Sequence, residues 1–331
     1  MIKPEQKNLL CNNSSGIIVE RVLGYAKTET EQGTEYPGTV LMLLFAAYSQ
    51  CLELEKQGGN CWKKEVAVSF NSYLLKHPEF TAWVSRVEDS LSNLGIWPRL
   101  SVPEFSRNGE PLPFPSKNSF LVGIDGPNGV GKTTVGKLLV DSLTGSVKTD
   151  VILVPREAMA SNFSHQLLKG QFRAECTHSL SWGSITETLV TSAAIYHHYS
   201  CDVPRSGIGI FDRGEASHYA YNVYNITTEY GSGKKEGAFA LLDSLLKMYH
   251  RNNLAIFLEA SPEVIMQRLS DAGDVIPEDF RVAIPMLNAL YRQYLDRIGS
   301  RGVLVNAKPS AQEILPVVAG IVERRFKENG K

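Results

Sequence analysis

Cysteine is scarce in this chain and follows no recognisable spacing. The 331 residues contain five cysteines, an odd number, and no two of them form a C-x-x-C pair. They lie far apart, at Cys11, Cys51, Cys61, Cys176 and Cys201. A disulfide framework or a structural zinc site needs paired or closely spaced cysteines. The sequence therefore argues against both and favours a reduced, cytoplasmic compartment.

Long hydrophobic runs and an excess of one charge are also absent. The longest apolar run, residues 40–48, is much shorter than the roughly 20 residues needed to cross a bilayer, and it is typical of a buried helix. The N-terminal residues lack the charged-then-apolar order of a signal peptide. The formal net charge of -1 gives no general attraction to nucleic acid or to an anionic membrane. We therefore expect neither as a partner, and any anion site has to be local.

The composition changes abruptly at residues 101–117, where four prolines lie among polar residues without a periodic apolar pattern. Such a stretch is typical of a linker. Before it, apolar residues recur at three- and four-residue steps, which predicts helices over about residues 19–30, 38–57, 64–76 and 79–94. We predict a small α-helical domain over residues 1–100, a Pro-rich linker over 101–117 and a second domain over 118–331. Binding of a protein partner is a candidate role for the helical domain.

After residue 118 the pattern changes to short apolar runs that alternate with helical stretches. This alternation predicts an α/β domain with a parallel sheet covered by helices on both faces. Five strands are predicted, over residues 120–125, 151–154, 208–211, 254–258 and 303–305. Ligands of such sheets bind beyond the carboxyl ends of the strands. Polar residues follow three of these ends, at Asp125, at Arg156 with Glu157, and at Asp212 with Arg213.

The most informative motif lies between the first predicted strand and the helix that follows it. Residues 126–133 read Gly-Pro-Asn-Gly-Val-Gly-Lys-Thr and satisfy G-x-x-x-x-G-K-[ST] in full. In such a loop the backbone N–H groups surround phosphate oxygens, the lysine reaches the outer phosphates and the hydroxyl can ligate Mg²⁺. The predicted nucleotide-binding residues are Gly126, Pro127, Asn128, Gly129, Val130, Gly131, Lys132, Thr133 and Thr134. We therefore expect a P-loop kinase core.

From about Ser119 onward the sequence resembles the thymidylate kinase family, with a fainter likeness to herpesvirus-type thymidine kinases. Residues 212–222 are similar to the motif D-R-[YF]-x-x-S-x-x-A-Y-Q and depart from it at Gly214 and Asn222. Arg156-Glu157 resembles the start of the family's Arg-Glu-Pro, and residues 262–264 repeat its Pro-Glu-Val. The order and spacing of these segments agree with the family.

The resemblance implies ATP- and Mg²⁺-dependent phosphoryl transfer to a pyrimidine deoxynucleoside monophosphate, by an enzyme that is usually a homodimer. It implies that Thr133 and Asp212 hold Mg²⁺, and that Asp125 orients the acceptor or the metal shell. The catalytic candidates are Lys132, Asp125, Arg213, Arg156 and Glu157. The acceptor-binding candidates are Arg156, Arg213, Ser217, Tyr221 and Asn222.

Two departures from the family leave alternatives open. The expected lid, residues 269–280, contains no basic residue, so the charge over the transferred phosphoryl group is expected from Arg268, from Arg281 or from elsewhere in the chain. The family's acceptor-binding helix arginine is replaced by Ile195. One alternative is a thymidine-type nucleoside kinase with Glu157 as the general base, because a nucleoside hydroxyl must lose a proton. Another is an ATP-binding regulatory or interaction module without efficient catalysis.

Overall fold

In the computed structural model the chain is described at residues 19–29, 31, 37–56, 63–95, 97, 118–154, 183–201, 204, 206–247, 252–274 and 279–329. It falls into two compact units that alternate along the sequence. One lies within residues 1–114, 159–201 and 225–249, and we call it the helical unit. The other lies within residues 115–158, 202–224 and 250–331, and we call it the sheet unit. The predicted linker, residues 101–117, lies outside the described residues.

The sheet unit contains five parallel strands in the order β2-β3-β1-β4-β5. Their bounds are Asn118–Asp125 (β1), Val151–Val154 (β2), Ser206–Asp212 (β3), Leu254–Glu259 (β4) and Gly302–Asn306 (β5). Because Ile124 pairs with Asp212, β1 and β3 end at the same level of the sheet. The predicted α/β class and five-stranded parallel sheet are confirmed.

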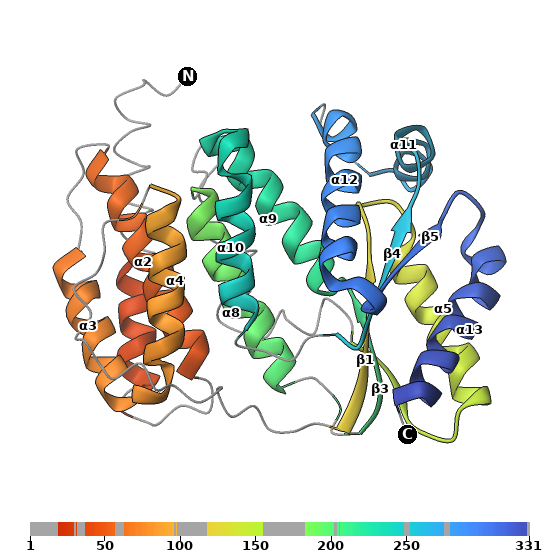
Figure 1. The fold of residues 1–331 in the computed structure, drawn as a ribbon, viewed down its shortest axis with the longest axis horizontal. Helices are drawn as coiled ribbons and strands as arrows, with labels where there is room; N and C mark the ends of the chain where they lie inside the picture. Colours follow the sequence, from red (N-terminus) through yellow and green to blue (C-terminus); the bar gives the residue numbers. More distant parts are fainter. Residues whose placement is uncertain are drawn as a thin grey trace. The chain divides into compact units, whose positions relative to one another are not determined.

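Helices cover both faces of this sheet (Figure 1). On one face α5 (Lys132–Ser146) packs with α13 (Ala311–Asn329), and on the other α12 (Phe280–Ile298) lies against β4 and β5. The short helix α11 (Pro262–Asp271) contacts α12, and the turn η4 (Gly299–Arg301) leads into β5. Val135 and Leu139 of α5 pack with apolar side chains of the strands in one core. The central strands β1, β3 and β4 are buried along most of their length, which explains why they read as continuous apolar runs.

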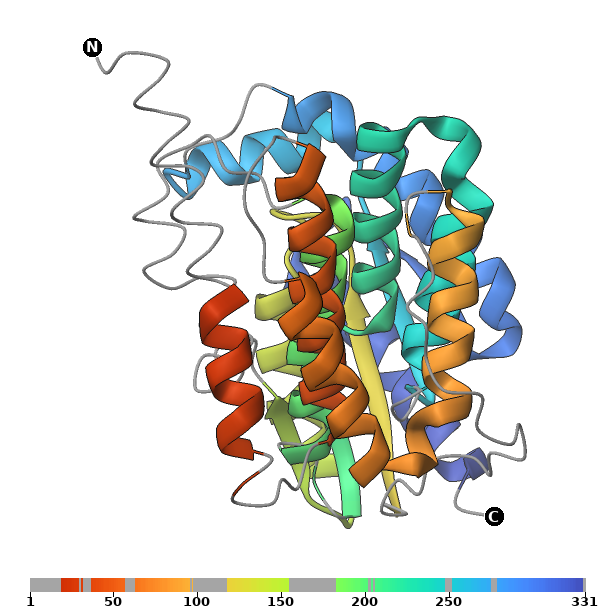
Figure 2. The same cartoon turned by 90° about the vertical axis from the view of Figure 1, so that its left-hand side faces the viewer.

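The helical unit brings together helices that are far apart in the sequence. It contains the helical residues 19–29 and 31, α2 (Pro37–Lys56), α3 (Lys63–Lys76), η1 (Pro78–Phe80), α4 (Thr81–Asn93), α8 (Ser184–Cys201), the end of α9 (Glu215–Tyr230), η3 (Ser232–Lys234) and α10 (Lys235–Leu246). Helix α2 packs against α3 and α8, and α4 packs against α10. Figure 2 shows α2, α4 and α10 with roughly aligned axes, as does Figure 1. The indole N–H of Trp83 donates to the carbonyl of Ser244 at 2.9 Å and ties α4 to α10.

The observed units differ from the contiguous domains predicted above. Helices α8 and α10 lie within residues 118–331, which the sequence assigns to one domain, but they belong to the helical unit. The physical reason is that they pack against α2 and α4. Periodicity shows that a helix has an apolar face without showing which partner covers it.

Helix α2 is the one described helix that is long and apolar enough, by length and composition, to cross a membrane. Most of that helix is buried. A helix buried against others needs apolar residues around most of its surface, so burial in the helical unit accounts for this composition.

Candidate functional site

The carboxyl ends of β1 and β3 form the natural ligand site of this sheet. In the sheet, β1 and β3 are neighbours. The chain leaves β1 toward β2 at one edge of the sheet, whereas it leaves β3 toward β4 in the direction of the opposite edge. A crevice opens where adjacent strands send their connections in opposite directions. A cavity of about 970 Å³ is present there. Its lining comes from the β1–α5 loop, the start of α5, the end of β3, the end of α11 and the start of α13.

Three glycines of the β1–α5 loop have a positive φ, and at two of them a Cβ would also clash with a neighbour. Gly126 has φ 145°, and a Cβ there would lie 2.5 Å from the carbonyl oxygen of Leu258. Gly129 has φ 79°, and its Cβ would lie 2.6 Å from the Leu269 side chain. L-residues rarely adopt this backbone, and here they would also clash. The glycine spacing seen in the sequence therefore reflects a tightly packed turn.

Lys132 lies at the first position of α5, and its ammonium group folds back into this loop. The side chain is 6% exposed, and Nζ donates to the carbonyls of Gly126 at 2.9 Å and Pro127 at 2.8 Å. The first N–H groups of a helix have no partner within that helix, and among the described residues no side chain caps α5. These N–H groups and the helix dipole add positive potential beside the ammonium group. The loop thus has the donors and the positive potential that an anion site requires, in a chain without a net positive charge.

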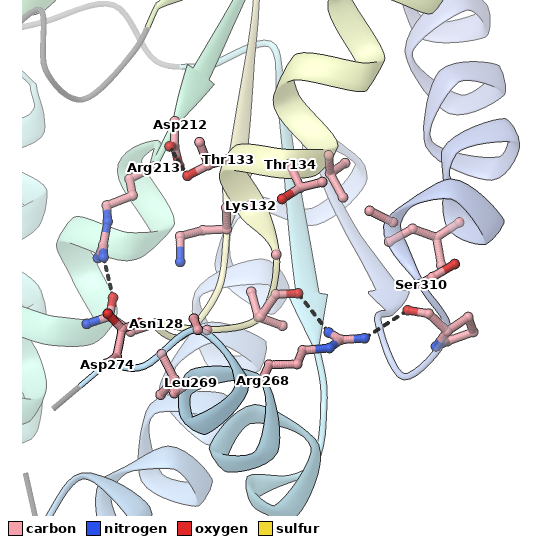
Figure 3. Close-up of a pocket in the computed structure, with 18 of the residues that line it drawn as sticks. Asn128, Lys132, Thr133, Thr134, Asp212, Arg213, Arg268, Leu269, Asp274 and Ser310 are labelled. Atoms are coloured by element: carbon pink, nitrogen blue, oxygen red, sulfur yellow. Dashed lines mark hydrogen bonds between the residues drawn. The ribbon is translucent and has the colours of Figure 1, made fainter. Parts of the chain in front are cut away.

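Thr133 and Asp212 place two oxygen ligands at the same wall of the cavity (Figure 3). The Thr133 hydroxyl donates to Oδ2 of Asp212 at 2.5 Å. Mg²⁺ prefers oxygen ligands and usually keeps several waters, so it is often bound by one or two protein groups. Across the part of the chain that the structure describes, no three His, Cys, Asp or Glu side chains form a metal cluster. The pair therefore fits a hydrated magnesium ion better than a fully protein-enclosed metal.

Arg213 lies on the same side of the cavity as Asn128 in Figure 3. Its guanidinium group donates to Oδ1 of Asn128 and lies 5.6 Å from the centre of the Tyr221 ring. Its backbone has φ 79°, which is unfavourable for a residue with a Cβ. The Arg213 N–H donates to the Ile124 carbonyl at 3.1 Å and holds this conformation. A strained residue with a positive side chain at the strand end is a frequent feature of functional sites.

The two arginines expected to supply charge from the lid occupy different environments. Arg268 lines the cavity, but its guanidinium group donates to the carbonyls of Val130, Lys308 and Pro309 at 3.0–3.2 Å. It joins the β1–α5 loop to the β5–α13 connection, and Figure 3 shows two of these bonds. Arg281 is exposed and is not among the described residues that line the cavity. Of the two candidates, the structure brings only Arg268 to the cavity.

Asp125 lies next to the site rather than in it. It is fully buried, and it is not one of the described residues that line the cavity. Its Oδ1 accepts hydrogen bonds from the N–H groups of Gly214 at 2.8 Å and Ser217 at 2.9 Å. N–H groups at the start of a helix such as α9 have no partner within the helix, and Asp125 supplies one. Burial raises the pKa of the Asp125 carboxyl, and the hydrogen bonds with Ser217 and Gly214 oppose this change. Asp125 therefore ties the end of β1 to the start of α9.

Replacing Asp125 by asparagine is expected to change how stability depends on pH. A carboxyl whose pKa is higher in the folded state than in the unfolded state favours folding at low pH, and this contribution is lost as the pH rises through the folded pKa. Asparagine keeps an acceptor for Gly214 and Ser217 but has no proton to lose. The free energy of unfolding of Asp125→Asn, relative to the parent, should therefore increase in urea titrations as the pH rises above about 4, the ordinary pKa of an aspartate. A relative stability that decreases over this range would contradict the prediction.

The predicted acceptor residues on α9 have different surroundings. The hydroxyl of Tyr221 accepts from the N–H of Asn128 at 3.2 Å, so Tyr221 contacts the loop. Ser217 and Asn222 are each 5% exposed. The side-chain amide of Asn222 donates to the carbonyl of His218 at 2.7 Å and lies 2.8 Å from its Nδ1. Asn222 therefore interacts within its own helix, whereas Tyr221 is placed beside the cavity.

Arg156 and Glu157 lie outside the described residues. The structure brings together Lys132, Thr133 and Asp212, with Arg213 and Asn128, at one cavity. Sequence reasoning missed Tyr291 of α12, whose hydroxyl donates to the Gly126 carbonyl at 3.1 Å. The only signal for it was its place in the apolar series Leu287, Leu290, Tyr291, Tyr294, which predicts burial but no polar role.

No protein-family model matches the sequence, and no curated protein matches it. The resemblance to thymidylate kinases therefore stays a prediction, and the function has to be argued from the site.

Proposed function

We propose that this protein is an ATP- and Mg²⁺-dependent phosphotransferase of the thymidylate kinase type, which acts on a pyrimidine deoxynucleoside monophosphate. The observation that carries the proposal is a single cavity. It is lined by a glycine-rich P-loop, by Lys132, by the Thr133–Asp212 pair and by Arg213. These are the groups that phosphoryl transfer needs, because the reaction depends mainly on positioning and on neutralising charge.

In this proposal each side chain has one role. Lys132 leaves the two loop carbonyls and contacts the outer phosphates of ATP, while the N–H groups at the start of α5 bind the remaining phosphate oxygens. Thr133 and Asp212 would hold Mg²⁺ directly or through water, and the ion would supply charge neutralisation for the phosphoryl group. Arg213 contacts the acceptor or the transferred group, and its contact with Tyr221 orients it.

A monophosphate acceptor fits the described residues better than a nucleoside. Transfer to a phosphate needs positive charge and no general base, and Arg213 lies at the cavity. A nucleoside hydroxyl would need a base, for which the sequence offers Glu157. Glu157 and Arg156 both lie outside the described residues, so the preference for a monophosphate rests on Arg213 alone.

Release of ADP in a coupled assay tests the proposal across a panel of nucleosides and monophosphates. We expect turnover with dTMP and Mg²⁺ and little with thymidine. Asp212→Asn should lower this turnover by about 100-fold or more, because a metal ligand contributes several kcal/mol to the transition state. Asp141→Asn is the matched control, since Asp141 is an exposed aspartate on α5.

The other outcomes separate the alternatives. Thymidine-dependent turnover that is lost in Glu157→Gln would identify a nucleoside kinase. ATP binding without turnover for any acceptor would identify a regulatory or interaction module. A wild-type protein that binds no nucleotide would rule out all three functions.

A further inference from the structure

The hydroxyl of Tyr291 lies beneath the P-loop, outside the cavity. The side chain is fully buried, and its ring stacks on Phe257 with centroids 4.6 Å apart and planes 12° apart. Its Oη is 3.1 Å from the carbonyl oxygen of Gly126 and 3.0 Å from Oγ of Ser217. The stacked ring fixes the position of the hydroxyl, whose single proton can be directed to either acceptor.

The two loop carbonyls that bind Lys132 each have a second donor. The Gly126 carbonyl accepts from Lys132 and lies within reach of Tyr291, whereas the Pro127 carbonyl also accepts from the N–H of Val130 at 3.3 Å. Gly126 and Pro127 are buried, so each carbonyl would carry a desolvation cost if it lost all its donors. These second donors remain in place when the lysine turns away.

We infer that Tyr291 is a positioning residue that makes the release of Lys132 to a phosphate less costly. When Lys132 donates to Gly126, the tyrosine O–H can donate its hydrogen bond to Oγ of Ser217. When Lys132 contacts a phosphate, the tyrosine O–H turns to the Gly126 carbonyl, so this buried carbonyl keeps a donor. This inference rests on the proposed function, because it requires that Lys132 binds phosphate.

Tyr291→Phe tests the inference, because it removes the hydroxyl and keeps the stacked ring. Affinities for Mg-ATP and for the base-free probe tripolyphosphate are measured by calorimetry. We expect both to weaken by roughly 5- to 100-fold, the effect of leaving one buried acceptor unpaired in the bound state. In the unliganded protein Lys132 still serves the Gly126 carbonyl, so the stability should fall little.

Tyr294→Phe is the matched control. Tyr294 is a buried tyrosine one turn further along α12, and its hydroxyl donates to Glu215 at 2.6 Å instead of to the loop. We expect unchanged affinities in this variant and a loss of unliganded stability at least as large as that of Tyr291→Phe.

Three results would overturn the inference, and they differ from one another. If Tyr291→Phe binds both probes as tightly as the wild type does, the hydroxyl has no role in binding. Equal weakening in Tyr291→Phe and Tyr294→Phe would show a general effect of α12 packing. A wild-type protein that binds neither probe would overturn the proposed function, and the inference with it.

Discussion

Lys132→Met is expected to lower ATP-dependent phosphoryl transfer by about 10²- to 10³-fold, the usual cost of losing one preorganised charge or donor at a reacting group. Methionine retains most of the length of lysine, so it fills the same buried space beside Gly126 and Pro127. It also removes an ammonium group from the protein interior, so folding should be preserved. The measurement is the initial rate of ADP release with dTMP as acceptor.

Lys137→Met is the matched control for this change. It makes the same substitution in the same helix, at a residue that is exposed and does not line the cavity within the described chain. We expect the parental rate in this variant. A Lys132→Met protein that is folded and retains the parental rate would exclude the proposed role of the P-loop lysine.

Acid is expected to destabilise the sheet unit through His218. Burial lowers the pKa of this histidine from 6.5 to about 3. The contact with Asn222 also favours the neutral ring. Nδ1 of His218 lies 2.8 Å from the side-chain amide nitrogen of Asn222, so a proton on Nδ1 would bring two hydrogen-bond donors together.

The sign of this effect follows from proton binding. Below pH 6.5 the unfolded chain takes up a proton at His218, whereas the folded chain does so only near pH 3. The contribution of neutral His218 to the free energy of unfolding is therefore fully present above about pH 6.5 and is lost as the pH falls toward 3. Each pH unit costs about 1.4 kcal/mol, so the total over this window is up to about 5 kcal/mol.

The measurement is the free energy of unfolding in urea at pH values across this window, for the parent and for His218→Asn. Asparagine keeps an oxygen near the position of Nδ1 but does not titrate, so the acid-dependent loss should become much smaller. His77→Asn is the control, because His77 lies in the helical unit with a side chain that is 24% exposed. An acid-dependent loss that is the same in His218→Asn and in the parent would contradict the prediction.

The strands show how much of the fold could be predicted from the sequence. All five predicted strands are present, and β2 has the predicted bounds of residues 151–154. The N-terminal helices also agree with the predicted segments to within about two residues, the usual uncertainty of a helix boundary. These elements were predictable because burial on one or both faces imposes a local period on the apolar residues.

The grouping of residues at the cavity was predictable only where the pattern is local. The motif G-x-x-x-x-G-K-[ST] is a contiguous sequence, and Asp212 and Arg213 lie at the end of a buried strand. The surroundings of Asp125 and Arg268 were not predictable. Asp125 binds N–H groups 89 and 92 residues away, and Arg268 binds carbonyls 40 to 138 residues away. A charged residue in a sequence does not reveal whether it contacts a ligand or a distant backbone group.

By itself, the sequence determined the α/β class, the order of the strands along the chain and the position of a glycine-rich motif at the end of β1. These features depend on periodicity and on glycine at positions a few residues apart. The tertiary structure alone decided that α8 and α10 pack with the N-terminal helices, that Arg268 joins two loops, and that Tyr291 reaches the Gly126 carbonyl. Those contacts depend on how separate elements pack in space, and no local sequence pattern encodes which partner a buried face or a polar side chain meets.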